Sequence, residues 1–108
     1  YANYLRFIER GRSELLRDAG IDQGALKRDE GAVFVVRRLT AEFVAPARFD
    51  DLLEVTTRVA GLRGASIEMG QEVRREETLL FSALVTVACM GVDGRPRRLP
   101  EQIRERLR

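Results

Sequence analysis

The hydrophobic pattern of this chain changes its period at Ala32, and that change restricts the fold more than any other feature. Before Ala32, apolar residues recur at helical spacing and form one stripe. The stripe consists of Tyr4, Phe7, Ile8, Gly11, Leu15 and Ala19. After Ala32, apolar and polar residues alternate as they do in half-buried strands. The sequence therefore predicts an α+β fold, in which one long helix precedes a sheet.

Proline, glycine and charged residues divide the region after Ala32 into four expected strands, at 32–43, 53–59, 67–74 and 78–90. The first is expected to place Val33, Val35, Leu39, Ala41 and Phe43 on one face. Connections of hairpin length make the last three strands a meander. Gly20 is the expected end of the long helix. Residues 21–31 are expected to be a polar connector that contains a helical turn near Ala25-Leu26-Lys27-Arg28, and Leu99-Pro100-Glu101 begins a short helix.

The fourth expected strand is apolar on both faces. Phe81 and Ala83 are expected on one face, and Leu80 and Leu84 on the other. Such a strand needs cover on both sides, and one helix covers only one side of a sheet. A partner subunit is one candidate for the second cover.

The composition removes several kinds of chemistry. The 108 residues contain no histidine and one cysteine, which excludes histidine-based triads and a disulfide framework. No Cys, Asp or Glu cluster has zinc-like spacing, and no metal or redox cofactor is expected. If the protein is an enzyme, the lack of histidine leaves a carboxylate or backbone dipoles to do the chemistry. No apolar run is long enough to span a bilayer and no signal peptide is visible, so a cytoplasmic location is predicted.

Positive charge gathers toward the C-terminus, although the net charge is only +2. The residues concerned are Arg95, Arg97, Arg98, Arg104, Arg106 and Arg108. A basic end suits an anionic partner. No basic stripe with interleaved aromatic residues supports a nucleic-acid partner. A phosphate-bearing small ligand needs only two or three such arginines.

Three segments carry a family resemblance, and together they span nearly the whole chain. They are Tyr1-x-Asn3-Tyr4-Leu5-x-Phe7-x-Glu9-x-x-Arg12, Phe43-x-Ala45-Pro46-Ala47-Arg48-Phe49-Asp50-Asp51-x-Leu53-x-Val55 and Gly94-Arg95-Pro96-Arg97-Arg98-Leu99-Pro100. They resemble the hotdog-fold acyl-CoA thioesterases of the 4-hydroxybenzoyl-CoA thioesterase type, including the Tol–Pal-associated enzymes. The resemblance implies a single hotdog domain over residues 1–108, in which a curved antiparallel sheet wraps a long helix. It also implies one further strand ahead of that helix, so that the domain is N-terminally incomplete.

The same resemblance implies where the chemistry occurs. A thioester carbonyl docks at the N-terminus of the long helix, where a backbone N–H at Tyr1 polarises it. The alternative role for Tyr1 is aromatic packing. The family's aspartate, which acts as nucleophile or base, lies seven residues ahead of Tyr1, and no residue of this sequence occupies that position. Glu9 is the second candidate catalytic residue; its alternative role is an ion pair with Arg12 on the helix surface.

Other residues are candidates for binding the substrate. The resemblance implies that arginines near the turn into the third strand and in the closing segment meet coenzyme A phosphates, partly across a subunit interface. Their alternative role is that of exposed surface charges, and the alternative for Asn3 is a helix cap. The candidates are Asn3, Phe7, Arg63, Gly64, Ser66, Arg97 and Arg98.

The sequence thus predicts an enzyme that hydrolyses acyl-CoA thioesters to a carboxylic acid and free coenzyme A, as a homo-oligomer, either dimer or tetramer. One alternative is a non-catalytic hotdog module that binds an acyl thioester or an acyl-carrier protein. A dehydratase of the same fold is disfavoured, because that chemistry recruits a histidine and this chain has none.

Overall fold

The computed structural model describes residues 2–108, and their side chains from Asn3 onward. The described elements are α1 (Ala2–Asp18), α2 (Gln23–Glu30), β1 (Ala32–Phe43), β2 (Glu54–Leu62), β3 (Ser66–Arg75), β4 (Thr78–Gly91) and α3 (Glu101–Leu107). The predicted α+β order of helix before sheet is confirmed. No helix in this part of the chain is long and apolar enough to cross a membrane.

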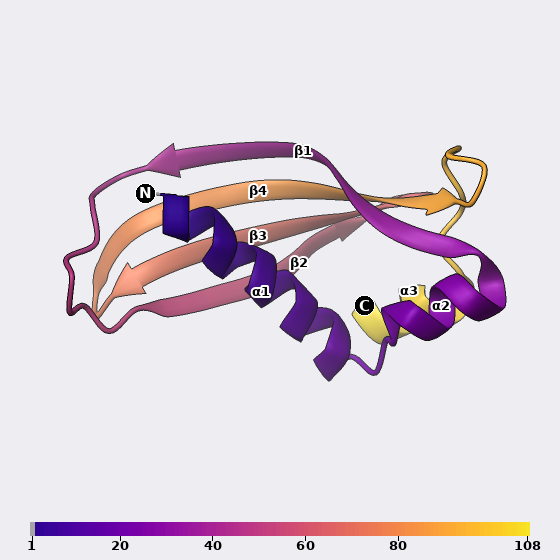
Figure 1. Ribbon diagram of the computed structural model, residues 1–108, viewed down its shortest axis with the longest axis horizontal. Helices are drawn as coiled ribbons and strands as arrows, with labels where there is room; N and C mark the ends of the chain where they lie inside the picture. The colour runs from indigo at the N-terminus through magenta and orange to yellow at the C-terminus, as the bar shows by residue number, and fades with distance from the viewer. Residues whose placement is uncertain (1) are drawn as a thin grey trace.

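The strands form one curved antiparallel sheet in the order β1-β4-β3-β2. The predicted meander is confirmed, because β3 pairs with both β2 and β4. In Figure 1, α1 lies across one face of the sheet, and α2 and α3 lie near one end. The edge strands are β1 and β2.

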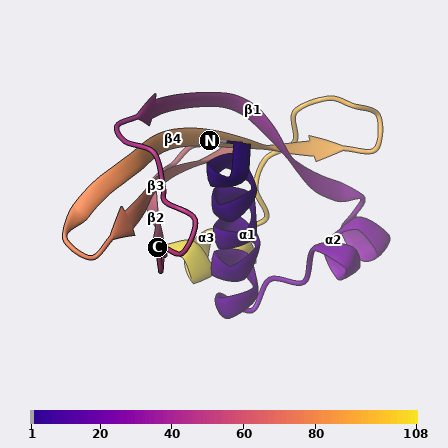
Figure 2. The same cartoon turned by 60° about the vertical axis from the view of Figure 1, so that its left-hand side comes forward.

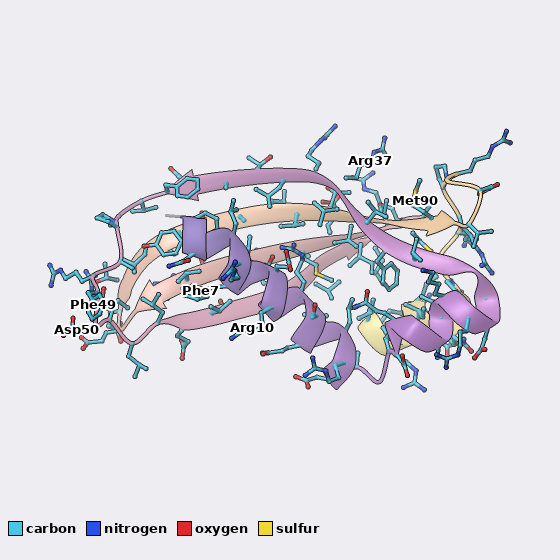
Figure 3. All side chains as sticks on the ribbon, viewed as in Figure 1. Phe7, Arg10, Arg37, Phe49, Asp50 and Met90 are labelled. Carbon is cyan, nitrogen blue, oxygen red and sulfur yellow. The ribbon has the colours of Figure 1, made fainter. Side chains whose placement is uncertain are left out.

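A bulge in β1 corrects the expected pattern of its side chains. The pairing with β4 shifts between Val36 and Arg38, so Arg37 is an extra residue and projects away from α1 (Figure 3). An extra residue reverses the alternation of faces beyond it. Val33 and Val35 therefore lie on the face opposite Leu39, and the prediction of one shared face for the whole strand was wrong.

A second bulge moves Leu80 into the core. Val73 of β3 pairs with Phe81 while the next residue, Arg74, pairs with Leu79, so Leu80 is the extra residue of β4. Leu80 is fully buried in the same core as Phe81, and its expected place on the opposite face was wrong. Leu84 does lie on that opposite face and is 49% exposed.

An aromatic cluster holds the first turns of α1 on the sheet. The ring of Phe81 lies 5.2 Å from that of Tyr4 and 4.9 Å from that of Phe43. The Tyr4 hydroxyl donates a hydrogen bond of 2.8 Å to the carbonyl oxygen of Ala45, just beyond β1. Tyr4 and Ile8 are buried, so the start of α1 is fixed by both apolar and polar contacts.

The other end of α1 leads into a helix that the sequence pattern only hinted at. Gly20 adopts φ +79° and ends α1, as predicted. Residues 21–31 were expected to be a connector, yet they contain α2, which is seen end-on in Figure 2. Asp22 caps α2 by accepting a hydrogen bond from the Ala25 N–H, and Gly31 ends it at φ 63°. These two caps explain why a short polar segment forms a helix.

Candidate active site

The N-terminal end of α1 lies beside the aromatic cluster of Tyr4, Phe43 and Phe81, at the end of the sheet where β1 stops and β4 begins (Figure 1). The first amides of a helix have no partner within the helix and carry partial positive charge. They therefore suit a carbonyl oxygen on which negative charge develops. The candidate Tyr1 lies outside the described residues.

Two other candidates on α1 are exposed. Asn3 is the second residue of α1, so it lies inside the helix and the alternative role as its N-terminal cap was wrong. Glu9 makes no ion pair within 4.0 Å in the described part of the chain, so the ion pair with Arg12, its alternative role, is not formed. The carboxylate of Glu9 is therefore free to meet water or a ligand.

Arg12 turns instead toward the interior of the protein. Its Nη1 donates a hydrogen bond of 2.9 Å to Oε1 of Gln71 on β3. The pKa of the Arg12 guanidinium is lowered, because the effect of burial outweighs the opposite effect of the negative charge of Glu9. Sequence reasoning did not single out Gln71, although one signal was present. It is the amide side chain in an otherwise apolar series of core-facing positions, Ile67, Met69 and Val73.

A hollow of about 420 Å³ lies between α1 and β2. Its walls are Phe7, Arg10, Gly11, Glu14, Asp51, Leu53 and Val55. Phe7 and Arg10 reach it from the first half of α1 (Figure 3). The structure thus places Phe7, half-buried, against an open groove near the start of α1.

The structure gathers the remaining candidates at the opposite end of the sheet, where β2 stops and β3 begins. The N–H of Leu99 donates to the Gly64 carbonyl at 2.8 Å, and Arg104 donates to the Arg63 carbonyl at 2.6 Å. The backbone N–H of Arg97 donates to Cys89, whose own N–H donates to Ala65 in the same turn. We call Arg63, Arg97, Arg98 and Arg104 the arginine cluster.

The charges of the arginine cluster are only partly neutralised. Arg63 lies 3.6 Å from Glu68, and Arg97 lies 3.6 Å from Glu30. Arg98 has no ion pair in the described residues, and its guanidinium lies against Gly64. Ser66 pairs with Ala88 at the start of β3. This surface therefore carries an excess of positive charge beside a glycine turn, which suits phosphate oxygens.

Asp51 stabilises the loop ahead of β2 and does not act as one of an acid pair. Its Oδ2 accepts a hydrogen bond from the Arg48 N–H and lies 2.9 Å from Arg75. The hydrogen bonds from Arg48 and Arg75 hold the pKa of the Asp51 carboxyl below its usual range. These contacts make Asp51 a turn residue that leads the chain into β2.

Because that pKa is depressed in the folded state, Asp51 contributes stability above the ordinary aspartate pKa of about 3.9. The contribution disappears as the pH falls through the folded pKa. We expect Asp51→Asn to be less stable than the unchanged protein at pH 7 and to match it at the acid end of the folded range. Urea unfolding at a series of pH values measures this. If the difference in unfolding free energy between the two proteins did not become smaller at acid pH, this prediction would be contradicted.

The curved antiparallel sheet with α1 across one face defines a protein of the hotdog class. Residues 1–82 match the Thioesterase superfamily. The acyl-CoA thioester hydrolase YbgC of Escherichia coli O6:H1 is 44% identical over 105 residues, which are 95% of this chain and 78% of the relative. The chain therefore belongs to the thioesterase superfamily.

Two solved structures extend this relationship. The probable thioesterase from Bartonella henselae is 44% identical, superposes with a TM-score of 0.84, and is matched over 92% of this chain and 82% of its own. A thioesterase from Thermus thermophilus, solved with coenzyme A and zinc, is 28% identical with a TM-score of 0.83. That match covers 100% of this chain and 77% of the other.

Proposed function

We propose that this protein hydrolyses acyl-CoA thioesters to a carboxylic acid and free coenzyme A. The observation that carries the proposal is the fixed start of α1, which the Tyr4–Ala45 hydrogen bond and the aromatic cluster hold at one end of the sheet. Membership of the thioesterase superfamily supports it, as does the similarity to the acyl-CoA thioester hydrolase of Escherichia coli.

In the proposed reaction, the thioester carbonyl oxygen points at the first amides of α1. Water adds to the carbonyl carbon, and the negative charge on the oxygen is opposed by the helix N-terminus with no reorganisation. The carbon–sulfur bond then breaks, and the thiolate of coenzyme A leaves and takes up a proton. We assign the activation of the attacking water to an aspartate seven residues ahead of Tyr1, as the family resemblance implies. We assign the orientation of that water to Glu9.

We assign the coenzyme A phosphates to the arginine cluster, with Ser66 and Gly64 shaping the turn, and the acyl chain to the groove beside Phe7. The start of α1 and the turn between β2 and β3, where the arginine cluster gathers, lie toward opposite ends of the sheet (Figure 1). We therefore propose that one coenzyme A contacts the start of α1 in one copy and the arginine cluster of a second copy. A two-fold axis brings opposite ends of two copies together.

The strand β1 is the proposed contact between the two copies. It is an edge strand of 12 residues, and unpaired edges are templates for pairing with another chain. Large apolar side chains along and just beyond it stay exposed: Val35 48%, Val36 43%, Leu39 38%, Phe43 48% and Val44 52%. Antiparallel pairing of β1 with its copy would cover them and join the two sheets. A tetramer and a cytoplasmic location remain predictions.

Removal of one arginine from the cluster tests the phosphate assignment. We expect Arg98→Ala to raise the KM for an acyl-CoA about tenfold, because a charge-assisted hydrogen bond contributes about 1.5–3 kcal/mol. The same variant should hydrolyse a short acyl thioester of N-acetylcysteamine, which has no phosphates, as well as the unchanged protein does. Steady-state thiol release measures both.

The matched control for this prediction is Arg17→Ala, an exposed arginine near the end of α1 and outside the arginine cluster. It should leave both KM values unchanged. If Arg98→Ala left the KM for acyl-CoA unchanged, the assignment of the coenzyme A phosphates to the arginine cluster would be contradicted.

A further inference from the structure

Gln71 is the buried polar side chain of the described core, with 2% of its surface exposed. Its Nε2 donates to the Ile8 carbonyl of α1 at 2.8 Å and to Oγ1 of Thr57 on β2 at 2.9 Å. Its Oε1 accepts from Nη1 of Arg12, one turn further along α1. A single amide on β3 therefore joins the helix to two strands, and its contacts with Ile8 and Arg12 depend on where α1 lies.

The helix backbone comes closest to the sheet at the same point. A Cβ placed on Gly11 would lie 2.6 Å from Thr57 Oγ1, 3.2 Å from Val55 Cγ1 and 3.3 Å from Gln71 Nε2. Real Cβ atoms are not found as close as the first of these distances, so a larger residue would require the Thr57 side chain to turn away from Gln71 or α1 to move away from β2. Gly11 therefore sits on the sheet beside the Gln71 contacts.

These contacts restrict α1 in a way that apolar packing does not. Burial of apolar surface is non-directional, so it tolerates small slides of a helix over a sheet. The hydrogen bond from Gln71 to the Ile8 carbonyl and the one that Gln71 accepts from Arg12 require narrow distances and angles. They hold the middle of α1, while the Tyr4 hydroxyl holds its first turn. A helix held at two points along its length cannot shift its N-terminus alone.

We propose that Gln71 is a positioning residue for thioester hydrolysis: it fixes α1 on the sheet and thereby aims the first amides of the helix at the substrate carbonyl. This inference rests on the proposed function, because it concerns the same carbonyl site. Gln71 itself contacts no substrate. Its amide is required as both donor and acceptor, a combination that neither glutamate nor methionine supplies.

The decisive variants are Gln71→Met, which removes the hydrogen bonds at similar size, and Gly11→Ala, which crowds α1 against Thr57. We expect each to lower kcat about tenfold and to change KM less than about twofold, because misplacement by about 1 Å costs up to about a hundredfold in rate. Adding Thr57→Ala to Gly11→Ala removes the closest clash and should restore most of kcat. A crystal structure of Gln71→Met should show α1 displaced on the sheet relative to its position in the unsubstituted protein.

Val73→Ala is the matched control, because Val73 is buried two residues along the same face of β3 and has no hydrogen-bonding side chain. It should lower stability while leaving kcat unchanged. The inference is overturned if Val73→Ala loses as much kcat as Gln71→Met, if Thr57→Ala fails to rescue Gly11→Ala, or if α1 is not displaced. If the unsubstituted protein hydrolysed no acyl-CoA thioester, the proposed function itself would be refuted, and this inference with it.

Discussion

Replacement of Tyr4 by alanine is expected to lower the free energy of unfolding by about 3–5 kcal/mol, the usual cost of removing a large buried aromatic side chain. Tyr4 is 2% exposed, packs its ring at a tilt against that of Phe81 and donates a hydrogen bond to the Ala45 carbonyl. The variant loses apolar burial and leaves that carbonyl without this donor. Denaturation in urea followed by circular dichroism measures the change.

Tyr4→Phe is the matched comparison, since it removes only the hydroxyl. Its expected cost is about 0.5–1.5 kcal/mol, the net contribution of one hydrogen bond. If alanine and phenylalanine at this position gave the same small loss, the ring would contribute little and α1 would have to be held on the sheet by other contacts.

Substitution of two exposed apolar residues of β1 by lysine is expected to have a large effect on kcat/KM. Val35 and Leu39 lie on opposite faces of this edge strand and are 48% and 38% exposed. In Val35→Lys/Leu39→Lys, like charges from two copies would meet across a two-fold axis, and charged edges resist strand pairing. We expect a monomer by size-exclusion chromatography with light scattering. We also expect kcat/KM to fall by at least about tenfold, since the monomer lacks the partner's phosphate contacts.

The control for the edge variant is Val92→Lys, at a turn position that is 84% exposed and outside every strand. It should remain a dimer with ordinary activity. The account of β1 as the contact would be contradicted by a dimer that survives both lysines, or by a monomer that keeps full kcat/KM.

The long helix, the four strands and the short last helix could be predicted from the sequence because their signals are local, whereas α2 was expected to be part of a connector. The change of period at Ala32 separates α1 from the strands, and Gly20 ends α1 where a left-handed residue is needed. The bulges at Arg37 and Leu80 could not be predicted in the same way. A bulge is set by the register of two paired strands, and neither strand records it in its own alternation.

Part of the candidate site could likewise be predicted from sequence motifs, whereas the rest depends on contacts that exist only in the folded protein. The family resemblance named Arg63, Gly64 and Arg98, and the structure brings them together although they lie far apart in the chain. Gln71 was missed because its significance comes from α1 crossing the sheet directly above it. The alternative role of Glu9, an ion pair with Arg12, is not formed for a related reason: Arg12 hydrogen-bonds to Gln71, a partner that only the folded chain places within reach.

The most direct test of the central claim is release of free thiol from a panel of acyl-CoA thioesters by the protein as its gene encodes it, including any residues that precede Tyr1. The panel should contain short, long and aromatic acyl groups. The account predicts hydrolysis of at least one of them with a kcat/KM in the enzymatic range, above about 10⁴ M⁻¹s⁻¹. Tight binding of acyl-CoA with no thiol release from any member would contradict it and identify a non-catalytic binding module.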